Sequence, residues 1–245
     1  MIIAFSGCAN SGKTTLIKKF LNNWPMYASP VETYRDALKE KNMGHSKNTS
    51  EETQMFILNY MISQVKKYKD EGIKNIVYDR CPLDVLAYTI QAFELGKVNE
   101  DFVSEIVEKV KEALSAYDII FVLPFNPDIS IEDNGRRETD IEYIKRTDTI
   151  FMNIMHQYYT NFDSNDLFPK DCPGIILLDS PDKMSDIRAL INTDGQLYSP
   201  EEDQKLQEQF MGAISDAKNN KKMLEAVIQN QESLLPRVNV SKLKI

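Results

Sequence analysis

Residues 7–14 read GCANSGKT and fit the pattern G-x-x-x-x-G-K-(S/T). The short apolar run at 2–5 predicts a buried strand before the motif, and apolar residues at helical spacing over 14–21 predict a helix after it. Between a strand and a helix, the N–H groups of a glycine-rich loop point at phosphate, and the helix N-terminus adds partial positive charge. The motif therefore predicts a binding site for nucleotide phosphates, and a glycine turn without a ligand is the alternative.

The side chains of this loop have separate expected roles. Lys13 is expected to reach the β- and γ-phosphates, and the Thr14 hydroxyl is expected to bind Mg²⁺. The other loop residues expected to bind the nucleotide are Gly7, Asn10, Ser11, Gly12 and Thr15. ATP and Mg²⁺ are thus the cofactors that the sequence predicts.

Length and composition limit the class of protein. The 245 residues are 42% apolar and 27% charged, which is typical of one large globular domain or of a domain with an appendage. A net charge of −8 argues against a surface that grips nucleic acid or an anionic membrane, and no apolar run approaches the ~20 residues of a membrane helix. Three cysteines and two histidines offer no zinc set. With no visible signal peptide, we expect a cytoplasmic protein.

Predicted strands alternate with predicted helices along the chain. The expected strands lie at 2–5, 26–31, 76–78, 119–123 and 175–178. The expected helices lie at 14–21, from a capping box of Thr49 and Glu52 to 72, and at 82–96, 101–116, 141–162 and 181–191, with a loop at 124–139. The alternation predicts an α/β fold, a three-layer sandwich with a mostly parallel sheet. We expect one domain over 1–195 and a C-terminal helical appendage over 196–245, which docks on this domain or pairs with a second copy in a homodimer.

Asp79 and Arg80 directly follow the predicted strand at 76–78. Ligands of open α/β sheets lie beyond the carboxyl ends of the strands, so Asp79 is expected near the phosphate loop if the two strands are neighbours. A carboxylate there can orient Mg²⁺ or its waters, and Arg80 can hold a phosphate or the acceptor. The structural alternative is an aspartate at a helix start beside a solvated arginine.

Glu32 and Arg35 follow the second predicted strand. A glutamate at the end of that strand can accept the proton of an acceptor hydroxyl. Arg35 lies three residues further on the same helical face, where it can bind substrate or orient Glu32. The structural alternative is an ion pair on the surface.

A charged stretch at 133–137 (DNGRR) is followed by Arg146. Guanidinium groups on a closing loop stabilise the charge of a transferred phosphoryl group and exclude water. We therefore expect Arg136, Arg137 or Arg146 to act in catalysis, and the alternative is a solvated charged loop.

These segments together resemble the nucleoside- and nucleotide-kinase-like branch of P-loop proteins, over about residues 1–195. The chain is most similar to the small kinase-like AAA-domain group that includes the ribosylnicotinamide kinase domain, and its Asp79-Arg80 pair is also similar to that of thymidylate and deoxynucleoside kinases. The resemblance implies a P-loop fold, Asp79 in the metal site, Arg80 at the substrate and lid arginines at the transferring phosphate. It also implies a loop with Pro181 beside the adenine. Asn134 departs from the aspartate that usually precedes the lid glycine.

The combined prediction is a transferase of nucleotide metabolism, an ATP- and Mg²⁺-dependent kinase of a small nucleoside-like or nucleotide acceptor. Glu32, Arg35 and Arg80 are the expected acceptor-binding residues. Glu32 is also the expected base if the acceptor group is a hydroxyl, whereas a phosphate acceptor needs no strong base. Two alternatives stay open. One is a P-loop ATPase that acts as a switch or assembly protein, and the other is a polynucleotide or modified-base kinase, which needs a basic channel.

Overall fold

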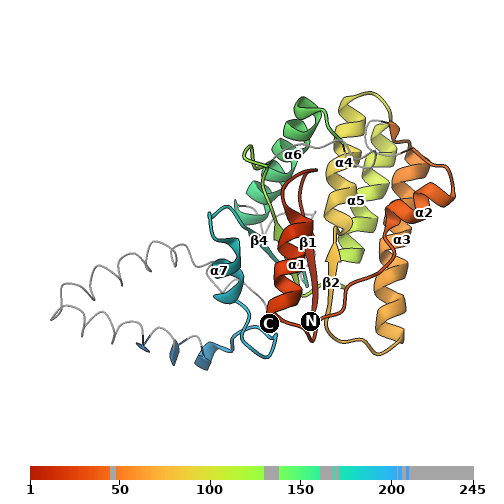
Figure 1. The fold of residues 1–245 in the computed structure, drawn as a ribbon. Helices are drawn as coiled ribbons and strands as arrows, with labels where there is room; N and C mark the ends of the chain where they lie inside the picture. The colour runs from red at the N-terminus through yellow and green to blue at the C-terminus, as the bar shows by residue number, and fades with distance from the viewer. Residues whose placement is uncertain are drawn as a thin grey trace.

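A computed structural model describes residues 1–44, 48–129, 138–160, 168, 171–202, 204–205 and 208–209. Its strands are β1 (Ile2–Ser6), β2 (Ile76–Asp79), β3 (Ile119–Val122) and β4 (Gly174–Leu177). Its helices are α1 (Lys13–Asn23), α2 (Tyr34–Glu40), α3 (Glu51–Asp70), α4 (Pro82–Glu94), α5 (Glu100–Leu114), α6 (Ile141–Thr160) and α7 (Lys183–Arg188). The expected alternation of strands and helices is confirmed (Figure 1).

The four strands form one parallel sheet in the order β2-β1-β3-β4. β1 pairs with β2 on one side and with β3 on the other, so that Ile3 lies opposite both Val77 and Ile119. The strands are buried almost throughout, as expected of a parallel sheet that is covered on both faces. Because β1 and β2 are parallel neighbours, the segment that follows Ser6 lies next to Asp79.

Helices cover the sheet on both faces, which confirms the three-layer α/β sandwich (Figure 1). Successive side chains of a strand point to opposite faces, and β1 follows this rule: Ile2 and Ala4 belong to one apolar cluster, Ile3 and Phe5 to the other. The larger cluster joins the sheet to α3, α4, α5 and α6, and the smaller one joins it to α1 and α7. The sheet that carries the phosphate loop is thus covered by packed helices on both faces.

The expected strand at 26–31 is reduced to one isolated bridge, between Ala28 and Ile76. The amide of Ala28 donates to the carbonyl of Asn75 at 2.9 Å, and Val77 donates to the carbonyl of Ala28 at the same distance. Pro30 has no N–H group with which to continue the ladder. The segment therefore runs along the edge of β2 without becoming a strand.

The cap of α3 lies one residue after the predicted position, whereas α4 begins where the sequence predicts. The expected cap at Thr49 is wrong by one residue, because the Ser50 hydroxyl accepts from the amide of Thr53 at 3.2 Å and α3 begins after it. The hydroxyl of Thr49 instead accepts from the amide side chain of Gln54 at 2.8 Å. Pro82 begins α4 as expected, since a proline at the first helical position lacks only an N–H that has no helical partner.

The chain returns to the domain after α7. The amide of Tyr198 donates to the carbonyl of Leu190 at 3.2 Å, and Leu197 packs against the smaller apolar cluster. Tyr27 also donates from its hydroxyl to the carbonyl of Gly195 at 2.6 Å. The chain is therefore bound to the domain through Tyr198, three residues past the expected boundary at 195. Past Tyr198, the structure describes only residues 199–202, 204–205 and 208–209 of the expected appendage.

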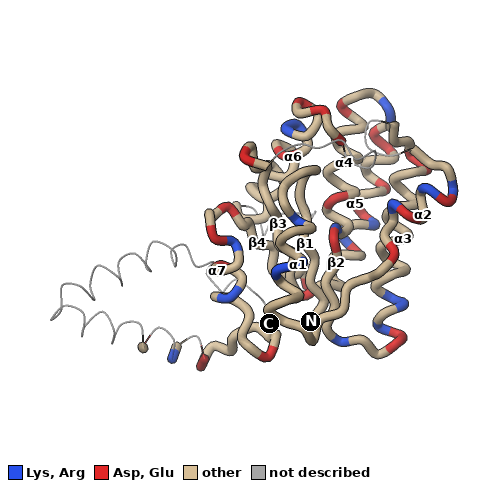
Figure 2. Tube along the Cα trace, in the orientation of Figure 1, with Lys and Arg blue, Asp and Glu red and all other residues tan. Residues whose placement is uncertain are grey.

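Residues of both charges occur along the described chain, including α2, α3 and α5 (Figure 2). In α3 the acidic residues Glu51 and Glu52 lie in the first turn and Lys67 and Lys69 in the last. Within the described ranges, no helix has both the length and the apolarity needed to cross a membrane.

Candidate functional site

The phosphate loop joins β1 to α1 at the carboxyl end of the sheet. Gly7 has φ +131°, and a Cβ atom there would lie 2.3 Å from the carbonyl oxygen of Leu123. Only glycine fits this position, because a side chain would collide with the backbone of the neighbouring strand end. Gly12 also has a positive φ, of +88°, and starts α1. The motif glycines thus fold the loop tightly against β3.

Lys13 is buried beneath the loop, with only 6% of its surface exposed. Its ammonium group donates to the carbonyls of Gly7, at 2.9 Å, and Cys8, and to the hydroxyl of Ser11, also at 2.9 Å. Burial and, to a smaller extent, the nearby Arg80 lower the pKa of Lys13 to about 8. The ammonium therefore lies within the loop, held by groups of the loop itself.

Thr14 and Asp79 meet where α1 begins and β2 ends. The Thr14 hydroxyl donates to Oδ2 of Asp79 at 3.2 Å. Oδ1 of Asp79 is buried and has no hydrogen-bond partner among the described residues. An unpaired carboxylate oxygen beside a hydroxyl is the oxygen chemistry that Mg²⁺ prefers, so these two residues fit the expected metal site.

Arg80 and Asp84 form an ion pair below the cleft. Nη1 of Arg80 lies 2.6 Å from Oδ1 of Asp84, and the two side chains are 5% and 2% exposed. Oδ2 of Asp84 accepts from the Ser6 hydroxyl at 2.7 Å and from the amide of Cys81 at 3.0 Å. This carboxylate therefore ties the end of β1 to the start of α4 and fixes Arg80 between them.

The Arg80 guanidinium also faces other groups of the site. Nη1 lies 3.3 Å from the carbonyl of Gly7, Nη2 donates to the Tyr88 hydroxyl at 3.3 Å, and the guanidinium carbon lies 5.1 Å from the centre of the Tyr88 ring. Burial alone lowers the pKa of Arg80, but Tyr34, Tyr88 and Asp84 outweigh it and raise this pKa above its ordinary value. The backbone of Arg80 has φ +85°, a conformation that non-glycine residues rarely adopt and that clusters at functional sites.

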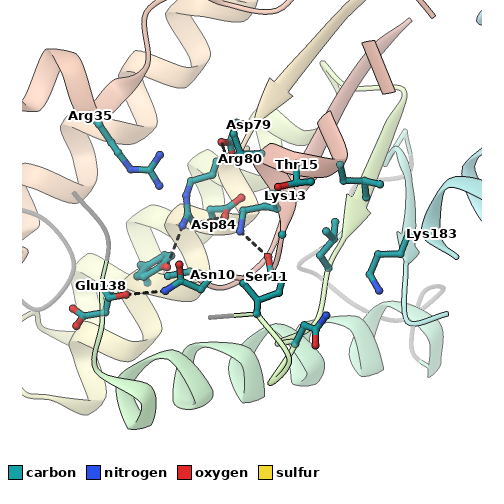
Figure 3. Close-up of a pocket in the computed structure, with 18 of the residues that line it drawn as sticks. Asn10, Ser11, Lys13, Thr15, Arg35, Asp79, Arg80, Asp84, Glu138 and Lys183 are labelled. Atoms are coloured by element: carbon teal, nitrogen blue, oxygen red, sulfur yellow. Dashed lines mark hydrogen bonds and ion pairs between the residues drawn. The ribbon is translucent and has the colours of Figure 1, made fainter. Parts of the chain in front are cut away.

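A cleft of about 430 Å³ opens above these residues and continues to both sides of the phosphate loop (Figure 3). One side is formed by α1 and the start of α7; its lining residues are Lys19, Pro181, Asp182, Lys183 and Met184. The other side is formed by α2, α3 and α4; its lining residues are Tyr34, Arg35, Gln54, Ile57, Met61, Val85 and Tyr88. The half toward α7 is called the donor side below and the half toward α2 the acceptor side, after the roles proposed for them in the next subsection.

The segment after β3 closes the cleft on its third side. Asn126, Ile129 and Glu138 belong to the lining, and the amide side chain of Asn10 donates to the carbonyl of Glu138 at 3.0 Å. Cys8 lies in the phosphate loop next to these residues. Burial raises the pKa of its thiol to about 12, so the thiol stays protonated at neutral pH.

Most of the residues singled out by sequence lie together in the cleft. The lining includes Asn10, Ser11, Gly12, Lys13, Thr14, Thr15, Arg35, Asp79, Arg80 and Pro181. Gly7 lies beneath the loop and faces Leu123. The pairing of Asp79 with the phosphate loop follows from the adjacency of β1 and β2.

Two expected catalytic residues lie elsewhere. Glu32 is exposed, lies in the bend that precedes α2 and does not line the cleft. Arg146 does not line the cleft either: it pairs with Glu94 at the end of α4, with Nε donating to Oε2 at 2.7 Å. Arg136 and Arg137, with the rest of 133–137, lie outside the described residues.

Asp84, Tyr88 and Lys183 also line the cleft, although the sequence pattern did not predict a role for them. Asp84 had a detectable signal, since it is the third residue of α4, a position from which a carboxylate can accept from the backbone amide just before the helix, here that of Cys81. Lys183 had none, because its place in the cleft depends on how α7 packs against α1.

A phosphate loop between a central parallel strand and its helix, with a carboxylate on the adjacent strand, defines a P-loop protein. Residues 2–162 match the family model described as an AAA domain, and the chain belongs to this family. Its α/β fold is of the P-loop kinase-like type. None of the curated proteins matches the sequence.

The solved structures with a similar fold include the following two. One is deoxyadenosine kinase from M. mycoides with the products dCMP and a flexible dCDP bound; the TM-score is 0.52 at 19% identity, over 73% of this chain and 90% of that chain. The other is NadR protein in complex with NR, with a TM-score of 0.52 at 14% identity, over 74% of this chain and 46% of the NadR chain. The chain thus corresponds to about half of NadR.

Proposed function

We propose that the protein is an ATP- and Mg²⁺-dependent kinase that transfers a phosphoryl group to a small nucleoside-like or nucleotide acceptor. The observation that carries the proposal is the shape of the cleft. It extends past the phosphate loop into a second half lined by α2, α3 and α4, which leaves room for an acceptor beside the nucleotide. A protein that only hydrolyses ATP needs no such second half.

ATP is assigned to the donor side. The loop N–H groups and the start of α1 receive the phosphates, with Asn10, Ser11, Gly12 and Thr15 at the mouth of the loop. Lys13 stands under the loop with its charge directed at the carbonyls, and turns to the β- and γ-phosphates when they replace these partners. Pro181 and Lys183 border the space left for the base.

Thr14 and Asp79 are the residues that would hold Mg²⁺. The hydroxyl of Thr14 and the unpaired Oδ1 of Asp79 supply oxygen ligands or bind the waters of the ion. When bound, the ion neutralises the charge that develops on the phosphoryl oxygens. Both residues lie on secondary-structure elements of the core, so their positions do not depend on the acceptor.

Arg35 and Arg80 are assigned to the acceptor, together with the aromatic rings of Tyr34 and Tyr88. The rings of Tyr34 and Tyr88 offer flat apolar surfaces for a base or sugar. This half of the cleft is closed by Gln54, Ile57 and Met61 of α3. Glu32 and Arg146 are left out of this assignment because they lie outside the cleft. A lid role for Arg136 and Arg137 rests on the sequence pattern alone.

The test is a panel of nucleosides, nucleotides and ribosylnicotinamide with ATP and Mg²⁺, read by ADP release and product mass. A kinase gives acceptor-stimulated ADP release and a product heavier by one phosphoryl group. Turnover that no small molecule stimulates, and that a macromolecule changes, supports the switch ATPase instead. Transfer to a polynucleotide but to no free nucleoside or nucleotide supports the polynucleotide kinase.

A further inference from the structure

Two guanidinium groups face the same space on the acceptor side. Figure 3 shows the Arg35 side chain extending from α2 toward Arg80. Among the described residues, no carboxylate pairs with Arg35, whose guanidinium carbon lies 5.1 Å from the ring centre of its neighbour Tyr34. Because Asp84 balances the charge of Arg80, the Arg35 charge is the one left without an anion on the described part of this side of the cleft.

Arg80 has one N–H donor without a partner among the described residues. Asp84 and Tyr88 occupy its Nη1 and Nη2, but Nε is buried and has no partner in the described part of the chain. The Arg80 side chain is only 5% exposed, so bulk water does not reach Nε to accept its hydrogen bond. A buried, charged donor without a partner indicates that a ligand atom completes its hydrogen bonding.

Of the carboxylates that line the described part of the cleft, Asp84 pairs with Arg80, and none pairs with Arg35. Asp84 accepts from three donors, and Oδ2 of Asp79 accepts from Thr14. Glu138 accepts through Oε1 from the amides of the two residues that follow it. Asp182 caps α7 on the donor side by accepting from Ser185 at 3.1 Å.

We infer that the acceptor carries a phosphate group that lies between Arg35 and Arg80, so that the substrate class is a nucleoside monophosphate and not a nucleoside. The inference rests on the proposed function and deepens it. Arginine forks match the oxygens of phosphate, and charge-assisted hydrogen bonds of this kind are stronger than neutral ones. The exposed position of Glu32 agrees with this class, because an ionised phosphate needs no base.

The reaction balances without a proton acceptor. A non-bridging oxygen of the acceptor phosphate attacks the γ-phosphorus of ATP, and a new P–O bond forms. The bond between this phosphorus and the β–γ bridging oxygen breaks, and its electron pair leaves with ADP. The products are ADP and a nucleoside diphosphate, and no electrons are exchanged with another reactant.

The test compares each common nucleoside and ribosylnicotinamide with its own 5′-monophosphate. Binding to the full chain is measured by calorimetry without ATP, and transfer is measured with ATP and Mg²⁺ by product mass. We expect a monophosphate to bind at least about tenfold more tightly than its nucleoside, and to yield the diphosphate. Arg35→Gln should remove this difference by weakening the monophosphate and leaving the nucleoside unchanged. Arg188→Gln, which removes an exposed arginine of α7 outside the cleft, should leave both affinities as they are.

Two results would overturn the inference, and they differ in what they say of the proposed function. If nucleosides bind as tightly as monophosphates and are themselves phosphorylated, with Arg35→Gln changing neither, then the kinase stands and its acceptor is a hydroxyl. If no nucleoside or monophosphate binds or is phosphorylated while ATP is still hydrolysed, then the kinase proposal fails and the inference fails with it.

Discussion

Nη1 of Arg80 and Oδ1 of Asp84 lie 2.6 Å apart in a part of the molecule that water barely reaches. The pair joins the end of β2 to the first turn of α4, and Ser6 at the end of β1 donates to the same carboxylate. A buried ion pair costs desolvation energy, so its value lies in the position that it gives to its members. Here it holds a guanidinium at the meeting point of the phosphate loop and the acceptor side.

Removal of the Asp84 carboxylate should destabilise the protein. Asp84→Ala leaves the Arg80 charge buried without a partner, and we expect a loss of about 3–5 kcal/mol in the free energy of unfolding, measured with urea. Glu108→Ala removes an exposed carboxylate of α5 and should change this free energy by less than about 0.5 kcal/mol. Equal stabilities of the two variants would show that Arg80 reaches water in the folded state.

Lys13→Met should abolish phosphoryl transfer and keep the apolar part of the buried side chain. We expect a loss of at least about 3 kcal/mol in transition-state stabilisation, or roughly a hundredfold in kcat, as for the loss of one preorganised donor. Lys18→Met changes an exposed lysine of α1 that does not line the cleft, and should retain the rate. Near-normal turnover of folded Lys13→Met protein would remove the phosphate-loop assignment.

Burial of Lys13 should also be visible in the pH dependence of stability. Its pKa is lowered to about 8, whereas a lysine of the unfolded chain has a pKa of about 10.4. Between these two pH values the unfolded chain binds more protons than the folded protein, so a rise in pH favours folding. Wild-type protein without nucleotide should therefore gain stability relative to Lys13→Met as the pH rises from about 8 to about 10. Urea unfolding of both proteins across this range gives the difference, and a constant difference would contradict the lowered pKa.

Asp79→Asn should raise the Mg²⁺ concentration needed for half-maximal rate. The amide keeps the shape and the contact with Thr14, but it removes the charge that attracts the ion. The rate at saturating ATP should fall much more than the affinity for ATP without metal, which calorimetry measures. An unchanged Mg²⁺ dependence would make Asp79 a structural residue of the β2 end.

Truncation after Tyr198 should retain acceptor-stimulated turnover, because every residue assigned to the site lies before residue 194. Truncation after Asp194 is the matched comparison. It removes the carbonyl of Gly195 that accepts from Tyr27 and the Leu197 side chain that packs on the core, and should lower the thermal midpoint further. If the longer truncation stays folded and binds ATP but loses transfer, the C-terminal residues belong to the acceptor site.

The sequence by itself determined the class of fold and the phosphate loop with Asp79 beside it. The motif at 7–14 requires glycines at fixed places and a lysine beside them, and these demands are local, so they can be recognised in a string of residues. The alternation of apolar strands and amphipathic helices is also a local property, and it predicts the parallel sheet. Asp79 could be placed because a strand's end fixes the position of the residue that follows it.

Only the tertiary structure decided the acceptor half. Its walls come from α2, α3 and α4, which meet through packing and not through sequence proximity. The same packing turns Glu32 out to solvent, pairs Arg146 with Glu94 and buries Asp84 under Arg80. The sequence pattern predicts which residues carry charge, but a charge acts in a site only where the fold directs it, and that direction depends on contacts between distant segments.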